Sequence, residues 1–105
     1  MIDARTRIVI TARAQRDLES IATYVTRQDG PARASLVMDK ISTTWRNLAH
    51  NPAIGRARPE LRGRGALFFP ASSWLIMYRP LPDFSGIRIV RIIHGRRDLS
   101  RAVRE

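Results

Sequence analysis

A chain of 105 residues without cysteine is long enough to fold unaided, and it excludes a disulfide scaffold and thiol catalysis. Its formal net charge is +10, and 18 of the 19 lysine and arginine residues are arginine, so the partners that fit are anionic: nucleic acid, a nucleoprotein or an acidic protein. No run of about 18 apolar residues is present, so neither a secretion signal nor a membrane span is expected, and the expected location is the cytoplasm.

The N-terminal half predicts a short strand followed by a helical hairpin. Arg7 to Thr11 is typical of a strand, and its last residue suits the N-cap of a helix. Apolar residues at helical spacing then predict a helix from about Ala12 to Gln28. Asp29-Gly30-Pro31 predicts a tight turn, after which the same periodicity indicates a longer helix from about Pro31 to His50.

The segment from Asn51 to Gly65 is predicted to be a basic loop. Besides prolines and glycines it carries one carboxylate, Glu60, against four arginines: Arg56, Arg58, Arg62 and Arg64. These cations either hold a phosphate backbone or an acidic partner, or belong to an ordinary solvated loop. Their spacing matches no phosphate-loop motif.

The C-terminal half predicts three strands. Ala66 to Pro70 and Ser73 to Arg79 favour a hairpin, and the prolines and glycine that follow predict a turn before a strand over Ile87 to Ile93. Strict alternation puts Ile87, Ile89, Arg91 and Ile93 on one face and Arg88, Val90, Ile92 and His94 on the other. Apolar residues on both faces indicate a central strand that is covered on both sides.

The order β, α, α, β, β, β predicts an α+β fold for one domain spanning residues 1–105. We expect the helical hairpin to pack on one face of a mostly antiparallel four-stranded sheet. Trp45 and Trp74 are expected in the core, because Trp45 lies on the apolar stripe of the second helix and Trp74 alternates with Ile76. Two isolated histidines and no cysteine give no metal site, and no cofactor is expected.

Four segments carry a pattern that recurs in one superfamily of toxins. They are Thr11 to Leu18 with Ile21 and Tyr24, Leu48 to Arg56, Trp74 to Arg79, and Ile92 to Asp98. Together they resemble the RelE/ParE toxins of type II toxin-antitoxin systems over nearly the whole chain, and the His-Gly-Arg-Arg-Asp ending most resembles the ParE branch. The resemblance implies a small toxin neutralised by a cognate antitoxin that wraps it. ParE members act on DNA gyrase, whereas RelE members cut messenger RNA at the ribosome.

A ribonuclease without metal needs a base, an acid and cations for the charge on the phosphate. The candidate set is Arg91, His94 and Arg97, with His94 either a base or a residue that makes one structural hydrogen bond. RelE-type enzymes commonly carry a tyrosine near the C-terminus, and this chain has none after Tyr78. The favoured hypothesis is therefore a toxin that binds gyrase without catalysis; the alternatives are a RelE-like ribonuclease and a basic binding module that has lost its toxicity.

The surface expected to bind gyrase and an acidic, ParD-like antitoxin combines apolar and cationic residues. The antitoxin is expected to lie along the helical hairpin and the sheet. The apolar contacts predicted are Val25, Leu36 and Val90, and the cationic contacts are Arg56, Arg58, Arg62, Arg64, Arg96 and Arg97. We expect Arg96 or Arg97 to pair with an internal carboxylate such as Asp17, which would leave the other arginine for a partner.

Overall fold

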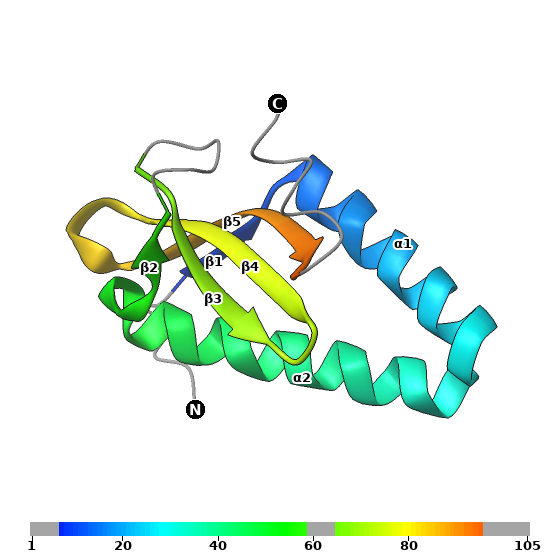
Figure 1. Ribbon diagram of the computed structural model, residues 1–105. Coiled ribbons are helices and arrows are strands. Elements are labelled where there is room, and N and C mark those ends of the chain that lie inside the picture. The colour runs from blue at the N-terminus through cyan, green and yellow to red at the C-terminus, as the bar shows by residue number, and fades with distance from the viewer. Residues whose placement is uncertain (1–6, 59–64, 96–105) are drawn as a thin grey trace.

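Two helices joined by a single glycine pack against a five-stranded sheet in the computed structural model, which describes residues 7–58 and 65–95 (Figure 1). The helices are α1 (Ala12–Asp29) and α2 (Pro31–His50), and short 3₁₀ helices cover Pro52–Ile54 and Pro82–Phe84. The strands are β1 (Arg7–Ile10), β2 (Arg56–Ala57), β3 (Leu67–Ala71), β4 (Trp74–Pro80) and β5 (Gly86–His94). Their order across the sheet is β1-β5-β4-β3-β2. No helix in the described ranges has the length and apolar character needed to cross a membrane.

The predicted helical hairpin is confirmed, with α1 one residue longer than expected. Thr11 is the N-cap of α1: its hydroxyl accepts a hydrogen bond from the Ala14 N–H at 3.1 Å and contacts the carbonyls of Ile89 and Val90. The turn depends on Gly30, whose φ of 89° few other residues adopt. Pro31 follows at the first position of α2, where its fixed φ suits a helix start.

The sheet has five strands, so the expectation of four was wrong. The additional strand is β2, which lies within the predicted basic loop and pairs with Leu67 and Phe68 of β3. A strand of two residues contains no alternation, and so the sequence pattern carries no signal for it. The sheet is mostly antiparallel as predicted, with β1 and β5 as the one parallel pair among the described strands.

A β-bulge in β5 overturns the predicted division of its residues between the two faces. Tyr78 pairs with Ile89 and Met77 pairs with Arg91, so Val90 is the extra residue. The bulge shifts the alternation by one position. Ile92 consequently joins Ile87 and Ile89 in the core beneath the helices, while Ile93 faces the other way.

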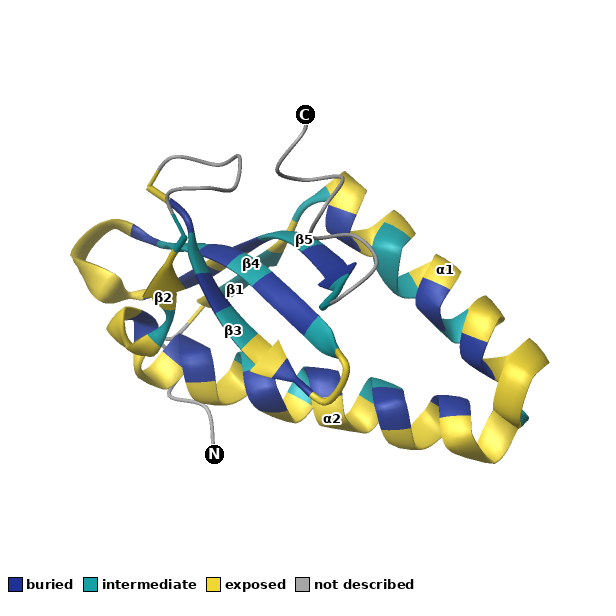
Figure 2. Ribbon diagram, in the orientation of Figure 1, coloured by how far each residue is buried: buried dark blue, intermediate teal, exposed yellow. Residues whose placement is uncertain are grey.

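Apolar side chains gather on both faces of the sheet, as predicted for a central β5. Figure 2 shows buried residues along β3, β4 and β5. The main core lies between the helices and the sheet and includes the fully buried Ile41, Leu48, Ile76 and Tyr78. Trp45 and Trp74 are half-buried against it, which confirms their expected place in packing. A second cluster, on the face turned away from the helices, contains Ala66, Phe68, Leu75 and Ile93. We call this second face the outer face.

Tyr78 ties the end of α2 to the sheet. Its buried hydroxyl donates to the Pro52 carbonyl and accepts from the Gly55 N–H, both at 2.8 Å. A side chain at Gly55 would collide with the Tyr78 ring, so the glycine allows this close approach. Both hydrogen-bonding directions of the phenol are therefore used inside the fold.

Replacing Tyr78 with phenylalanine is expected to lower the free energy of unfolding by about 1–2 kcal/mol, because Pro52 and Gly55 lose their shared partner.

Burial raises the pKa of the Tyr78 phenol above its ordinary value of 10.0, and the Gly55 hydrogen bond only partly offsets this. The unfolded chain therefore loses this proton at a lower pH than the folded protein, and stability falls as the pH rises above about 10. Urea denaturation from about pH 8 to about pH 11 should show a steeper alkaline loss in wild type than in Tyr78→Phe. Parallel pH profiles would contradict this assignment.

Candidate functional site

One carboxylate of α1 fixes the C-terminal half of β5. β1 ends opposite Ile89, so none of the described strands lies beside the edge of β5 beyond that point. Asp17 takes the place of a strand there: one of its oxygens accepts from the Ile92 N–H at 2.9 Å and from Arg91 Nε at 2.9 Å. The other oxygen receives Arg91 Nη2 at 3.4 Å. Arg13 adds a weaker ion pair at 3.8 Å from the same carboxylate.

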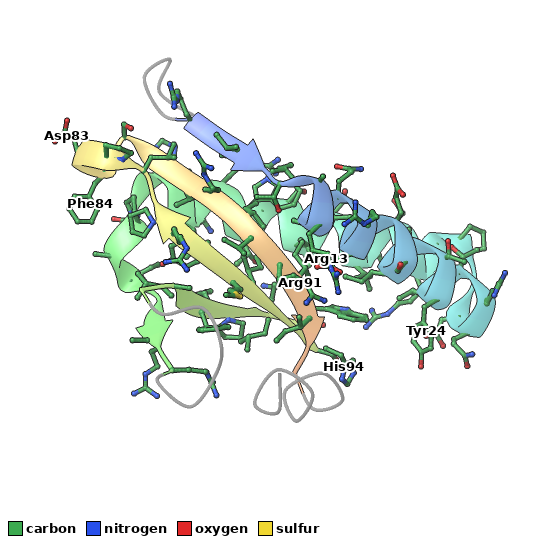
Figure 3. The ribbon with its side chains drawn as sticks, turned by 90° about the horizontal axis from the view of Figure 1, so that it is seen from above. Arg13, Tyr24, Asp83, Phe84, Arg91 and His94 are labelled. Carbon is green, nitrogen blue, oxygen red and sulfur yellow. The ribbon has the colours of Figure 1, made fainter. Side chains whose placement is uncertain are left out.

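This arrangement gives Arg91 a structural partner. Its side chain is 29% exposed and that of Asp17 only 13%, so the pair is partly shielded from water. Figure 3 shows Arg91 on the side of β5 that faces α1, near Arg13. A guanidinium held in a two-point hydrogen bond with a carboxylate has less of its charge available for a phosphate. The arginine expected at Asp17 was Arg96 or Arg97, both of which lie outside the described residues. In the part that the structure describes, Arg91 occupies that position.

His94 lies at the end of β5 against an indole. It pairs across the sheet with Trp74, and the two rings meet edge to face with centroids 5.1 Å apart and planes at 89°. The next residue, Gly95, donates its N–H to the Ser73 carbonyl at 2.9 Å and so closes the end of the β4–β5 pair. The packing of the His94 ring is consistent with a structural role. The third member of the candidate ribonuclease set, Arg97, lies outside the described residues.

The three apolar residues predicted to contact partners differ in exposure. Leu36 is 60% exposed on α2, as a docking residue requires. Val90 is half-buried at the bulge. Val25 is only 5% exposed, so its expected place on the surface was wrong. It continues the stripe of Ala14 and Ile21 that α1 packs against the core.

Two of the predicted cationic contacts, Arg56 and Arg58, are described. Arg56 is exposed on β2, and Arg58 follows directly, half-buried, with its Nε enclosed and without a hydrogen-bond partner. The remaining ones, Arg62, Arg64, Arg96 and Arg97, lie outside the described residues. Among the residues described, no group of three histidine, cysteine, aspartate or glutamate side chains is placed to hold a metal ion.

Sequence reasoning missed an apolar hollow beside the β4–β5 turn. Phe84 is 61% exposed and Ile54 is 50% exposed, and together with Asn51, Pro52 and Ala53 they line a hollow of about 230 Å³. Asp83 and Phe84 both have positive φ, 58° and 53°, which side-chain-bearing residues seldom adopt (Figure 3). A phenylalanine inside a turn was the signal that could have indicated this surface.

A polar groove runs along α1 and was likewise absent from the predictions. Its volume is about 550 Å³, and its lining includes Arg16, Ser20, Tyr24 and Arg27. Tyr24 is 43% exposed there, so this tyrosine of the family-like pattern lies at the surface rather than in the core.

Two solved structures that share this fold come from toxin-antitoxin systems. A chain of the chromosomal ParDE system from P. aeruginosa matches with a TM-score of 0.71 at 20% identity, covering 87% of this chain and 98% of that one. A chain of the toxin-antitoxin complex RelBE2 from Mycobacterium tuberculosis matches with a TM-score of 0.57, also at 20% identity, over 85% and 96%. Both likenesses show that the fold is shared.

Sequence comparison narrows the class. Residues 8–99 match the model of the ParE toxin of the type II toxin-antitoxin system parDE. Toxin ParE3 of Caulobacter vibrioides is 29% identical over 94 residues, which are 90% of this chain and 91% of that protein. The chain belongs to the ParE toxin family, as the four-segment pattern indicated.

Proposed function

We propose that this protein inhibits DNA gyrase by binding it, and that a cognate acidic antitoxin neutralises it in the cytoplasm. The observation that carries the proposal is the match to the ParE toxin model from residue 8 to residue 99, which spans both helices and the described strands apart from Arg7, the first residue of β1. The match includes the helices and strands that carry the candidate surface residues. We therefore expect this protein to have the activity of a ParE toxin.

The environments of the candidate catalytic groups favour binding over RNA cleavage. Arg91 is engaged by Asp17, and the Tyr78 hydroxyl is used by Pro52 and Gly55. His94 packs edge-on against Trp74. General acid and base catalysis needs groups within reach of the substrate and able to exchange a proton, and these side chains are occupied with holding the sheet together.

Charge and exposure support an acidic protein partner. A net charge of +10 attracts an acidic chain over several ångströms and accelerates its association. Exposed apolar residues such as Leu36 and Phe84 offer contacts for the partner's apolar side chains. The matched solved structures are described as toxin-antitoxin assemblies, which is consistent with a partner of this kind. Arg62, Arg64, Arg96 and Arg97 stay within the proposed contact surface.

The test is a supercoiling reaction with purified gyrase and relaxed plasmid. We expect the protein to stop supercoiling or to trap gyrase on cut DNA, and preincubation with a cognate acidic antitoxin to restore supercoiling. Undisturbed supercoiling, together with cleavage of ribosome-bound messenger RNA in register with the codons, would establish the RelE-like alternative instead.

His94→Ala separates the two mechanisms further. Under the proposed function this variant should keep at least about half of the wild-type inhibition, because a packing residue at a strand end contributes to stability and not to a reaction. Circular dichroism and thermal melting should accompany the assay as controls for folding. Loss of RNA cleavage by a folded His94→Ala protein would show that His94 is catalytic and would contradict the proposal.

A further inference from the structure

The outer face of the sheet brings together arginines that are far apart in the sequence. Arg79 of β4 and Arg88 of β5 are direct cross-strand partners, and Arg88 in turn pairs with Val9 of β1. Arg56 of β2 pairs with Phe68, whose own partner is Met77, and both belong to the outer cluster. By alternation the arginines of this face are Arg7, Arg56, Arg58, Arg79 and Arg88, which we call the outer-face arginines. Arg91 pairs with Met77 on the same face beyond the bulge, but it is already engaged by Asp17 of α1 and is not counted among them.

No carboxylate belongs to this sheet. The five strands contain arginines but no aspartate or glutamate, so no acidic side chain of a described strand neutralises the outer-face arginines. Arg79 and Arg88 stand opposite each other; Arg79 has an interaction within the protein, and Arg88 is exposed. Arg58 adds an enclosed Nε without a hydrogen-bond partner. The exposed Arg88 and the enclosed Arg58 Nε are therefore the two groups on this face that an anion would suit.

The surroundings of these arginines fit a phosphate backbone better than an acidic peptide. Ala66, Phe68, Leu75 and Ile93 are at most 5% exposed, so a peptide would find little apolar surface to cover on this face. Protein interfaces normally need an apolar centre, whereas binding of a nucleic acid backbone is carried by cations.

Duplex DNA fits better than single strands. The large apolar residues that are exposed in the described ranges are Ile10, Tyr24, Leu36, Ile54 and Phe84, and none of them is an outward residue of β3, β4 or β5. Proteins that bind single strands stack bases on exposed aromatic rings, and this face offers none in the described part.

The width of the face also suits duplex DNA. From β5 to β2 there are three strand spacings of about 4.8 Å, or about 14 Å in all. Duplex DNA presents roughly eight phosphate charges over that length.

We propose that the outer-face arginines form a contact site for the phosphate backbone of duplex DNA, without sequence preference. This inference goes beyond the proposed inhibition of gyrase and does not depend on it, because the binding is measured with DNA alone. If gyrase is the target, the same site would let the toxin touch the DNA that the enzyme holds.

The test compares two triple variants of equal charge. The first, Arg56→Gln/Arg58→Gln/Arg88→Gln, removes outer-face arginines and leaves Arg79, which has a further interaction within the protein. The control, Arg33→Gln/Lys40→Gln/Arg46→Gln, removes three exposed cations of α2. Each variant lowers the formal net charge from +10 by three to +7. Thermal melting checks that both fold.

The readout is the fluorescence anisotropy of a labelled duplex of random sequence, titrated at several salt concentrations. We expect the outer-face variant to bind at least about tenfold more weakly at about 0.1 M salt, and its slope of log K against log salt to shrink by about 2.7, or 0.9 for each lost phosphate contact. The control should keep its slope within about one of wild type.

Several results would overturn the proposal. Equal losses in the two variants would assign the binding to net charge instead of the outer face. Absence of wild-type binding at about 0.1 M salt would remove the site altogether. Tighter binding of a poly-glutamate peptide or of single-stranded RNA than of the duplex, lost in the outer-face variant, would identify a different ligand class.

Discussion

Replacing Asp17 with alanine is expected to lower the free energy of unfolding by about 3 kcal/mol. The substitution leaves a partly buried Arg91 guanidinium without its carboxylate and the Ile92 N–H without an acceptor. Losing one member of a shielded ion pair costs more than losing the same contact at the surface, because the remaining charge is then poorly solvated. Urea denaturation followed by circular dichroism measures the loss.

Two further variants isolate the role of Asp17. Arg91→Ala should cost less, about 1–2 kcal/mol, because Asp17 still accepts from the Ile92 N–H. Arg13→Ala removes only an exposed ion pair of 3.8 Å and should change stability by less than about 0.5 kcal/mol. If Asp17→Ala is no more harmful than Arg13→Ala, the carboxylate does not hold the end of β5.

Gly86→Ala is expected to detach β1 and to cost about 3 kcal/mol or more. Gly86 has a φ of 154° and lies directly against the backbone of Arg7, its partner in the parallel pair. A methyl group there would collide with the Arg7 carbonyl, and no side-chain rotation can relieve a clash with backbone. Hydrogen exchange of the β1 amides, together with denaturation, measures the effect.

Gly30→Ala is the matched control for that substitution. Gly30 also has a positive φ, 89°, but no atom lies within 4 Å of the position that a side chain would take. Its replacement should therefore cost only the backbone strain, about 1–2 kcal/mol. Equal effects of Gly30→Ala and Gly86→Ala would mean that the collision with β1 is relieved cheaply and that β1 tolerates displacement.

The helices were predictable because their signals are local. Periodic apolar residues and the Gly30-Pro31 turn determine where each helix begins and ends, and both bounds agree with the structure to within one residue. The faces of β5 were not predictable, because the run from Ile87 to Ile93 is apolar on both sides and satisfies either alternation. Only the pairing with β4 reveals the bulge at Val90.

The site was less predictable than the fold because its contacts are distant in the sequence. Asp17 and Arg91 are 74 residues apart, and their meeting depends on where β1 stops beside β5. The outer-face arginines come from four strands and the residue after β2, so they form one surface only in the folded sheet. Arg56 and Arg58 were recognised from their local density, whereas Arg79 and Arg88 were read as strand residues.

The central claim is that the protein acts by binding gyrase in a fixed stoichiometry. A titration of gyrase supercoiling against toxin concentration tests it directly, with the gyrase concentration held well above the dissociation constant. If the protein acts by binding gyrase, inhibition should saturate near a fixed ratio of toxin to gyrase, on the order of one toxin per binding site, and should not deepen with longer incubation. Full supercoiling at a large molar excess of folded toxin would contradict it.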